Sequence, residues 1–369
     1  MTAFYRTHRP ETLAEIIGQE HIVAVLRNAA SLNRMAHAYL FYGPRGTGKT
    51  TTARLVAKIA CCEKRTQDKA FHKKGEPCNV CTPCLEIAGG RGIDVVEIDA
   101  ASNRGIDEIR RLKEGIRLSP SSYAKKVFII DETHMLTKDA FNALLKTLEE
   151  PPAHAIIILA TTEFEKVPTT ITSRSQRFHF KKLTIEQIVE KLNKIVLKEK
   201  LNIDSDALEL IASLAEGSLR DGESLLDQVT ALDKKISVET IETTLGKIGL
   251  NKTSQFAEYV FNHDLAGALE YIKTIDDIGL NVVDLTRELI HYLRFALTLH
   301  HNPTFENRLK TQMTKKELEN IKAHAKKIQD KIHIPFVKEL LQAYSQMRYS
   351  PFASVPLEIA LIEHLRKTE

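Results

Sequence analysis

The sequence has 369 residues, which is too long for one ordinary hydrophobic core and predicts two or three domains. Apolar residues make up 43% and charged residues 27% of the chain, a balance that excludes an intrinsically disordered protein. The formal net charge of +4 permits nucleic-acid binding through a local patch, but it does not by itself indicate such a partner.

Short apolar runs alternate with amphipathic helical stretches in the first 180 residues. The apolar runs predict strands at 38–42, 94–98, 126–131, 155–161 and 177–180. The helical patterns between them lie at 50–62, 106–118 and 138–149. Pro151 and Pro152 end the last of these helices. Because several strands are apolar on both faces, we predict a parallel α/β sheet covered by helices.

The strand signals stop after residue 180, and the rest of the chain has helical patterns. The expected helix starts are marked by Thr184 with Gln187 as a capping box, by Asp204 as a cap, and by Gly217 with Ser218. These residues define a small helical domain over 181–243. Apolar residues at helical spacing predict a third, all-helical domain over 244–369, with no repeat period.

The segment 43–50, GPRGTGKT, lies directly between a predicted strand and a predicted helix and fits the Walker A pattern of phosphate-binding loops. Glycines let backbone N–H groups wrap the phosphates, Lys49 reaches the β and γ phosphates, and the Thr50 hydroxyl holds Mg²⁺. The helix N-terminus adds positive partial charge. The alternative is a Gly-rich turn without a ligand, which the complete pattern in this context disfavours. The predicted nucleotide-binding residues here are Gly43, Pro44, Arg45, Gly46, Thr47, Gly48, Lys49, Thr50 and Thr51.

A second acidic element follows the apolar strand at 126–131. Asp131 is expected to coordinate Mg²⁺ through its water shell, and Glu132 to orient or deprotonate the attacking water of a hydrolase. A strand-end acid alone would be read as a solubilising or capping residue. Next to a Walker A loop, the pair predicts an ATP-hydrolysing P-loop protein with Lys49, Asp131 and Glu132 as catalytic residues.

All five cysteines lie between positions 61 and 84, a clustering that predicts metal ligation rather than a secreted disulfide framework. Cys78, Cys81 and Cys84 form a C-x-x-C-x-x-C run, and Cys62 supplies a fourth thiolate for a closed tetrahedral zinc site. An iron–sulfur centre is the alternative, because thiolate spacing does not select the metal. Cys61 is expected to be a small apolar helix residue. His72 is a competing ligand in the basic segment 63–77, which we predict to be a solvated loop.

Separated motifs in the chain resemble one family over nearly the full length. The matching segments are 9–10, 18–21, 37–41, 43–50, 98–102, 131–136, 141–152 and 215–221. Together they resemble the gamma/tau clamp-loader subunits of bacterial DNA polymerase III. The resemblance implies an AAA+ module at 1–180 with an inserted zinc module at 62–84, a lid at 181–243 and an oligomerising collar at 244–369.

The family resemblance also assigns roles within a nucleotide site. Arg9 and Pro10 begin a segment that resembles the family's adenine-binding edge, although Leu13 stands where an aromatic residue is usual. Thr162 matches the sensor 1 position, which reads the γ-phosphate, with Thr161 competing for that role.

Two arginines have roles only through the resemblance. Arg220 matches sensor 2, which reaches the nucleotide from the lid. Arg174 matches the arginine finger, although Ser175 replaces the family's cysteine. Without the resemblance both would be read as solvated surface residues.

The resemblance implies a clamp-loader motor with ATP, Mg²⁺ and Zn²⁺ as cofactors. The implied partners are delta-type and delta-prime-type subunits in a ring, the sliding clamp and primer–template DNA. Nucleotidyltransferase activity would belong to the polymerase complex, not to this chain's own site. A branch-migration AAA+ helicase is the competing enzyme, and a nucleotide-insensitive scaffold is the competing non-enzyme. The cysteine cluster and the collar-like C-terminal region disfavour the helicase. The scaffold is disfavoured by the intact set of Lys49, Asp131, Glu132 and Arg174.

Location and further contacts are predicted from the same sequence. The longest apolar run, 155–160, is far shorter than a membrane span, and the N-terminus lacks the apolar region of a signal peptide, so we predict a cytoplasmic protein without a membrane partner. The sequence ends at Glu369, about where the collar would end, without a Pro-rich or basic tail for polymerase and helicase contacts. Arg104 and Arg110 are candidate contacts to DNA phosphates, with surface solvation as the alternative.

Overall fold

The computed structural model describes residues 3–103, 105–231, 235–245, 248–310 and 313–366. The chain forms two compact units. The first runs to Leu183 and also includes the short segment Gly217–Asp221, and the second contains Thr184–Glu216 and the chain from Gly222 onward. The predicted boundary at residue 243 falls inside the second unit, so the division into lid and collar stays a prediction.

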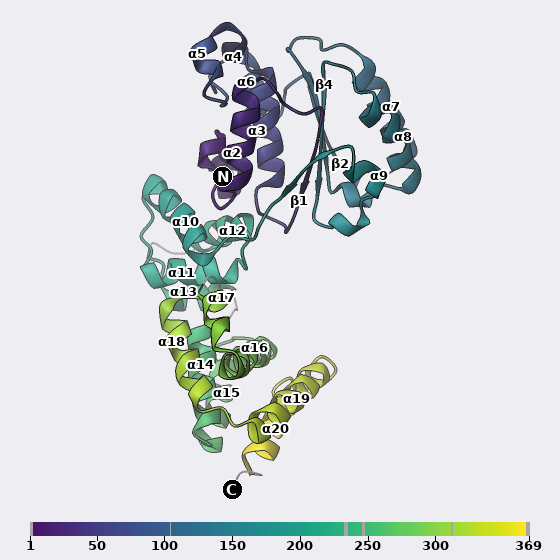
Figure 1. The fold of residues 1–369 in the computed structure, drawn as a ribbon. Coiled ribbons are helices and arrows are strands. Elements are labelled where there is room, and N and C mark those ends of the chain that lie inside the picture. The colour runs from purple at the N-terminus through teal and green to yellow at the C-terminus, as the bar shows by residue number, and fades with distance from the viewer. Residues whose placement is uncertain (1–2, 104, 232–234, 246–247, 311–312, 367–369) are drawn as a thin grey trace. The chain divides into compact units, whose positions relative to one another are not determined.

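The first unit is built on a five-stranded parallel sheet with the strand order β2-β3-β4-β1-β5 (Figure 1). The strands are β1 (Ala38–Tyr42), β2 (Val95–Asp99), β3 (Lys126–Asp131), β4 (Ala155–Thr161) and β5 (Gln176–His179). Three of the predicted strands agree residue for residue, and the other two are displaced by one residue. The predicted α/β fold class is therefore confirmed.

Helices cover both faces of this sheet, as successive strand residues point to opposite sides. Tyr39 and Phe41 of β1 pack into the core beneath one helical layer, and Ala38 and Leu40 pack into the core beneath the other. The first layer contains α2 (Glu20–Ser31), α3 (Lys49–Cys61) and α6 (Thr82–Ala88). The second contains α7 (Ile106–Arg117), α8 (Lys138–Glu149) and α9 (Thr169–Thr172). This arrangement places the carboxyl ends of all five strands at one edge.

The segment 63–77 differs from its prediction, because it is not a simple solvated loop. It contains two short helices, α4 (Glu63–Gln67) and α5 (Lys69–His72). Arg65 is buried and donates from Nη2 to the Ala30 carbonyl at 2.8 Å, so the segment is packed against the end of α2. The remaining short elements of the first unit are α1 (Phe4–Thr7), η1 (Leu13–Glu15), η2 (Thr133–Met135) and η3 (Phe164–Lys166).

The regular elements of the second unit, among its described residues, are helices, and an isolated β-bridge joins Ile203 to Ile236. Its first three helices are α10 (Ile185–Glu199), α11 (Ser205–Leu214) and α12 (Leu219–Thr230), the last of which begins in the first unit. The capping box of Thr184 and Gln187 is confirmed. Asp204 stands at the N-cap of α11 as predicted, but its side chain accepts no capping hydrogen bond. The later elements are α13 (Val238–Leu245), α14 (Leu250–Phe261), α15 (Leu265–Asp277), α16 (Val282–His301), η4 (Pro303–Phe305), α17 (Glu306–Leu309), α18 (Lys315–Lys326), α19 (Asp330–Met347) and α20 (Val355–Arg366).

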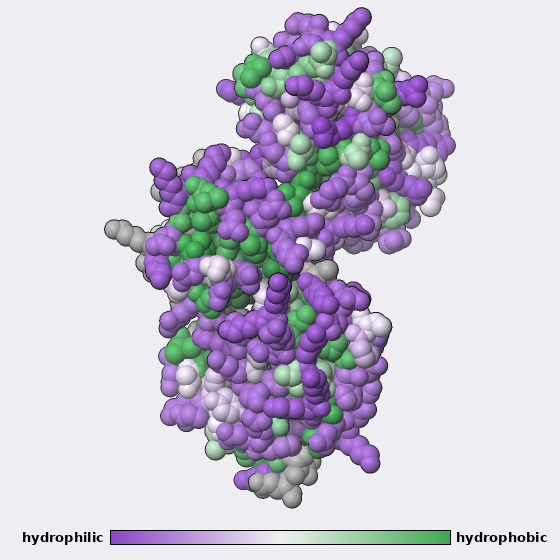
Figure 2. All heavy atoms as spheres, turned by 60° about the vertical axis from the view of Figure 1, so that its left-hand side comes forward, coloured by the Kyte–Doolittle hydropathy of each residue, from purple (hydrophilic) through white to green (hydrophobic). Residues whose placement is uncertain are grey.

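The face of the molecule drawn in Figure 2 is mainly polar. Hydrophilic residues dominate the face in Figure 2, with smaller hydrophobic patches between them. Among the residues that the structure describes, no helix is both long and apolar enough to cross a bilayer.

One buried carboxyl group predicts a pH-dependent stability. Glu223 on α12 is 5% exposed, and burial raises its pKa to about 7, with the charge of Lys191 acting in the opposite direction. Between the ordinary pKa of 4.5 and about 7, the folded chain holds a proton that the unfolded chain releases, so this group's contribution to stability falls as pH rises. Between pH 5 and pH 8 we expect this group to lower the free energy of unfolding of the wild type by about 3 kcal/mol, and Glu223→Gln to remove that decrease.

Urea unfolding of both proteins at pH 5 and pH 8 measures this difference. The exposed carboxyl of Glu319, replaced in Glu319→Gln, is the matched control and should leave the pH dependence of the wild type unchanged. Equal pH dependence in the wild type and Glu223→Gln would contradict the assignment.

Candidate functional site

The Walker A segment connects β1 to α3 at the carboxyl edge of the sheet. Gly43, Gly46 and Gly48 have φ values of 140°, 71° and 98°, which disfavour any residue with a Cβ. Two of them are also closely approached: a Cβ at Gly43 would lie 2.2 Å from the Phe180 carbonyl oxygen, and one at Gly46 would lie 1.8 Å from the Ser218 Oγ. The loop therefore holds its backbone N–H groups in a fixed curve.

Lys49 begins α3 and turns back over this loop. Its Nζ donates to the carbonyl oxygens of Gly43 at 2.9 Å and Pro44 at 2.8 Å, and the residue is 6% exposed. Burial lowers the pKa of Lys49, while the charges of Glu132 and Asp131 act in the opposite direction. Further negative charge at the loop would favour the ammonium form in the same way.

The other residues of the loop support its shape. Thr47 Oγ1 donates to the Pro44 carbonyl at 2.9 Å, and Thr51 is half-buried in the first turn of α3. Arg45 lies largely exposed, with Nη2 3.5 Å from Asp221 Oδ1. The shape of the loop therefore depends mainly on its curved backbone and not on any single side chain.

Thr50 and Asp131 meet across the site. The Thr50 Oγ1 donates to Asp131 Oδ2 at 2.7 Å, which joins the first turn of α3 to the end of β3. The other carboxylate oxygen, Oδ1, accepts from the backbone N–H of Glu132 at 2.9 Å. Both predicted magnesium-binding side chains thus present oxygen atoms at one point of the sheet edge.

Glu132 stands beside this pair in a left-handed backbone conformation, with φ of 47°. For a residue other than glycine this conformation costs about 1 kcal/mol, and it directs the side chain toward the end of β4. There Thr162 Oγ1 donates to Glu132 Oε2 at 3.1 Å. The Thr161 side chain is instead engaged with His134 Nδ1 at 3.0 Å and the Glu163 backbone N–H at 3.0 Å. Of the two competing threonines, it is Thr162 that reaches Glu132.

His134 is a residue whose position sequence reasoning did not single out. Its side chain is 7% exposed, with Nδ1 3.4 Å from Glu132 Oε2 and Nε2 3.2 Å from Glu163 Oε1. The signal was its spacing, two residues after the acidic pair, which on the tight turn η2 brings the ring back to the strand ends.

The segment Gly217–Asp221 docks on the Walker A loop. The backbone N–H of Leu219 donates to the Gly46 carbonyl at 3.0 Å, next to the close approach of Ser218. The guanidinium of Arg220 lies 4.9 Å from the centre of the Tyr5 ring, on the N-terminal helix α1. Arg220 therefore stands at the rim of the loop, in contact with the N-terminal segment. Arg9 and Pro10 are half-buried between α1 and η1.

Arg174 lies away from the Walker A loop, directly after α9 in the second helical layer. Its Nη2 lies 2.7 Å from Glu149 Oε1, and its Nη1 donates to the Thr170 carbonyl at 2.9 Å. It lines an open surface pocket with His37, Leu148, Glu149, Ser173 and Ser175. Ser175 Oγ donates to the Ile171 carbonyl at 3.0 Å, so this serine has its own local partner.

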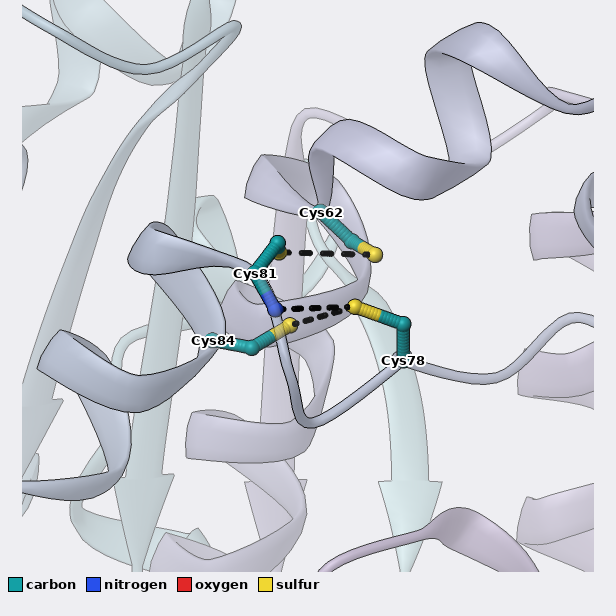
Figure 3. A group of neighbouring side chains, drawn as sticks. All are labelled: Cys62, Cys78, Cys81 and Cys84. Carbon is teal, nitrogen blue, oxygen red and sulfur yellow. Dashed lines mark hydrogen bonds between the residues drawn. The ribbon is translucent and has the colours of Figure 1, made fainter.

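The structure brings the four predicted cysteine ligands together (Figure 3). Cys62 is the C-cap of α3, Cys78 lies between α5 and α6, Cys81 is the N-cap of α6 and Cys84 lies in its first turn. All four Sγ atoms lie within 4.8 Å of one another. The Cys78–Cys84 and Cys62–Cys81 sulfur pairs are each 4.0 Å apart. The edge of a tetrahedron with Zn–S bonds of 2.3 Å is about 3.8 Å, so the spacing fits a metal site.

The surroundings of the cluster act unequally on its four sulfur atoms. The Cys78 Sγ accepts from the backbone N–H groups of Val80 at 3.5 Å and Cys81 at 3.3 Å. A hydrogen bond from the Cys84 thiol lowers the pKa of Cys62 to about 4, and the same bond raises the pKa of Cys84. Burial also raises the pKa of Cys81, so the shifts within the cluster run in opposite directions.

Cys61 and His72 stand apart from this cluster. The Cys61 thiol is buried and donates to the Lys125 carbonyl at 3.4 Å, and burial raises its pKa to about 12. His72 Nδ1 faces the Arg65 carbonyl at 3.2 Å and is not in the ligand group. Of the predicted DNA contacts, Arg110 lies exposed on α7, and Arg104 lies outside the described residues.

Two family models of known proteins match successive parts of the chain. A family model described as "DNA polymerase III, delta subunit" matches residues 18–184, and one described as "DNA polymerase III clamp loader subunit, ATPase lid domain" matches residues 187–234. The tau subunit of DNA polymerase III from Bacillus subtilis (strain 168) is 41% identical over 366 residues, which cover 98% of this chain and 62% of that protein. The chain thus spans less than two thirds of that relative's length.

A shorter relative is matched over nearly its whole length. The gamma subunit of DNA polymerase III from Buchnera aphidicola subsp. Schizaphis graminum is 35% identical over 359 residues, covering 97% of this chain and 96% of that protein. Among solved structures, the Thermotoga maritima RuvB Holliday junction branch migration motor is 20% identical, covers 64% of this chain and 72% of that chain, and has a TM-score of 0.47. That last likeness is too distant to bear on function.

Proposed function

The chain belongs to the gamma/tau subunit family of bacterial DNA polymerase III, and from this premise we propose that it is a clamp-loader motor that binds and hydrolyses ATP to load a sliding clamp onto primed DNA. The observation that carries the proposal is the convergence of Lys49, Thr50, Asp131, Glu132 and Thr162 at one edge of the sheet. A scaffold without nucleotide chemistry would have no need of this set.

The residues of the chain divide the work on the nucleotide. The curved loop 43–50 binds the phosphates through its N–H groups, and the Lys49 ammonium holds the β and γ phosphates. Thr50 and Asp131 offer the hard oxygen ligands that Mg²⁺ prefers, and their contact at 2.7 Å fits a shared ion. Bound there, Mg²⁺ would neutralise charge on the β and γ phosphates. Glu132 then orients the attacking water and accepts its proton.

The outer residues of the site sense the nucleotide in this proposal. Thr162, already on Glu132, is sensor 1, and Arg220, at the rim of the loop, is sensor 2. Arg9 and Pro10 form part of the adenine edge. Arg174 is the arginine finger and acts on ATP held by a neighbouring subunit, which its separation from the Walker A loop on the second helical layer supports.

The assembly follows from the same family membership. We place the AAA+ domain at 1–180, the lid at 181–243 and an oligomerising collar at 244–369, with delta-type and delta-prime-type subunits as ring partners. The sliding clamp and primer–template DNA are the other partners, and the cytoplasm is the place of action. Polymerisation of nucleotides belongs to the complex and not to this chain's own site.

The ATP turnover rate of the assembled complex tests this function. We expect turnover to rise several-fold when primed DNA and the sliding clamp are both present, because a clamp loader couples hydrolysis to both of them. Unprimed duplex DNA without the clamp is the control. A rate that responds to neither primed DNA nor clamp, but rises with a four-way junction, would support the branch-migration alternative instead.

Zinc is the metal we propose for the cysteine cluster. Four thiolates around one point match the closed coordination of a structural site, and the backbone N–H groups on Cys78 supply an outer shell. Iron–sulfur chemistry would require a redox role that no other feature of the described residues supports.

Metal analysis of the purified chain tests this assignment. We expect one zinc per chain, lost in Cys78→Ser with a lower unfolding temperature, because binding of a closed structural site contributes folding free energy. Cys61→Ser is the matched control and should keep the metal, as the Cys61 thiol faces Lys125. Iron with visible absorbance, or four freely titratable thiols and no metal, would overturn the assignment.

A further inference from the structure

The cysteine module, residues 62–84, contacts the N-terminal segment, residues 3–16, through a carboxylate. Glu76 accepts from the backbone N–H of Leu13 at 2.8 Å and from that of Ala14 at 3.1 Å. Its side chain is 12% exposed and also lies 3.2 Å from Arg27 Nε. One carboxylate therefore holds the first turn of η1, whose Leu13 is fully buried.

A second contact lies on the other side of Cys78. Asn79 has a left-handed φ of 60°, and its Nδ2 donates to the Glu11 carbonyl at 3.1 Å. The turn that presents Cys78 to the cluster thus presents Glu76 and Asn79 to the N-terminal segment. The position of these two side chains depends on the fold of the module.

The module is itself fixed to the body of the unit. Arg65 donates to the Ala30 carbonyl at the end of α2. Gly75, with φ of 67°, approaches so closely that a Cβ there would lie 2.4 Å from the Arg27 carbonyl oxygen. The module can therefore serve as a rigid support.

The N-terminal segment is joined to the nucleotide site at its other contacts. Tyr5 lies under the guanidinium of Arg220, whose neighbour Leu219 donates to the Gly46 carbonyl of the Walker A loop. Just after the segment, Gln19 Nε2 donates to the Lys181 carbonyl at 2.8 Å, and the Lys181 N–H returns a bond to Gln19 Oε1 at 3.1 Å. The segment therefore spans from the module to the loop.

We propose that the cysteine module anchors the N-terminal segment beside the nucleotide, with Glu76 as the positioning residue, and so sets the affinity for the adenine base. The proposal rests on the proposed function, in which this segment forms the adenine edge. Glu76 does not touch the nucleotide. It holds the backbone at Leu13 and Ala14, and through it the half-buried Arg9 and Pro10.

Binding of two probes tests the proposal on the full chain. Calorimetric titration measures the dissociation constants of ATP and of inorganic tripolyphosphate, which shares the phosphates of ATP but lacks the base. We expect Glu76→Ala to weaken ATP binding about three- to tenfold, since two backbone hydrogen bonds are lost, and to leave tripolyphosphate binding unchanged. Glu76→Gln, which keeps an acceptor oxygen, should recover part of the loss. Glu63→Ala, an exposed glutamate of the same module, is the matched control.

The outcomes separate this inference from the proposed function. Unchanged ATP affinity in folded Glu76→Ala, or equal weakening of both probes, overturns the inference. If Glu76→Ala does not fold, Asn79→Ala decides, and unchanged ATP affinity there has the same meaning. A wild type that binds neither probe contradicts the proposed function itself. Zinc content should stay the same in all variants, because none replaces a cysteine.

Discussion

Lys49→Ala is expected to abolish ATP turnover and leave the chain folded. In the proposed function the Lys49 ammonium binds the β and γ phosphates, and removing such a preorganised charge lowers the rate by at least about a hundredfold. The fold should tolerate the change because Lys49 is 6% exposed and burial disfavours its charged form. ATP turnover and thermal unfolding are measured on the same preparation.

A second lysine on the same helix provides the control. Lys58 lies on α3 and is 5% exposed, so Lys58→Ala also removes a buried lysine from α3, but about two and a half turns away from Lys49. It should retain turnover while Lys49→Ala does not. A folded Lys49→Ala protein that hydrolyses ATP at the parent rate would contradict the motor function.

Arg174→Ala is expected to abolish ATP hydrolysis at the site of the adjacent subunit, and not at the site of its own chain. A guanidinium supplied from outside stabilises charge on the transferring phosphoryl group and is worth roughly 10³ to 10⁵ in rate. In the structure Arg174 pairs with Glu149 on the second helical layer, whereas Glu132 contacts Thr162 at the carboxyl edge of the sheet. In the proposed ring, the two groups would belong to different active sites.

Mixing two inactive proteins tests this arrangement. Arg174→Ala and Glu132→Gln are combined under conditions of subunit exchange and assembled with their partner subunits. If the finger acts on the neighbour, some interfaces pair an intact Arg174 with an intact Glu132, and turnover partly returns. Lys49→Ala mixed with Glu132→Gln is the negative control, since both changes damage the same site and no interface is complete. Recovery in the control, or no recovery in the first mixture although mixed rings form, rules out the arrangement.

Local signals explain why the sheet and the loop were predicted well. Strands β3 and β4 are almost fully buried, so their apolar runs are unbroken, and β1 leads directly into the Walker A loop. The glycines of the loop itself determine its conformation. Its contact with Asp131 could be expected because the carboxyl ends of parallel strands meet at one edge.

The failures lie where structure depends on distant partners. The helices α4 and α5 span only a few residues each and are too short to show a period, although Asp68 carries the capping signal of α5 through bonds to Ala70 and Phe71. The burial of Arg65 depends on a carbonyl in α2 that no local pattern reveals. The docking of 217–221 on Gly46 is equally non-local, because it joins positions more than 150 residues apart in the sequence. Only the assembled fold shows these contacts.

The left-handed turn at Glu132 makes the two oxygens of its carboxylate unequal. Oε2 accepts a hydrogen bond from Thr162 Oγ1 at 3.1 Å, whereas His134 Nδ1, 3.4 Å from the same oxygen, has its hydrogen bond with Thr161 Oγ1. A carboxylate oxygen that already accepts a hydrogen bond has one fewer lone pair open to water. Oε1 is therefore the atom to which a water would give its proton. In the proposed function, the Thr162 hydroxyl would thereby select which carboxylate oxygen takes the proton before any nucleotide is bound.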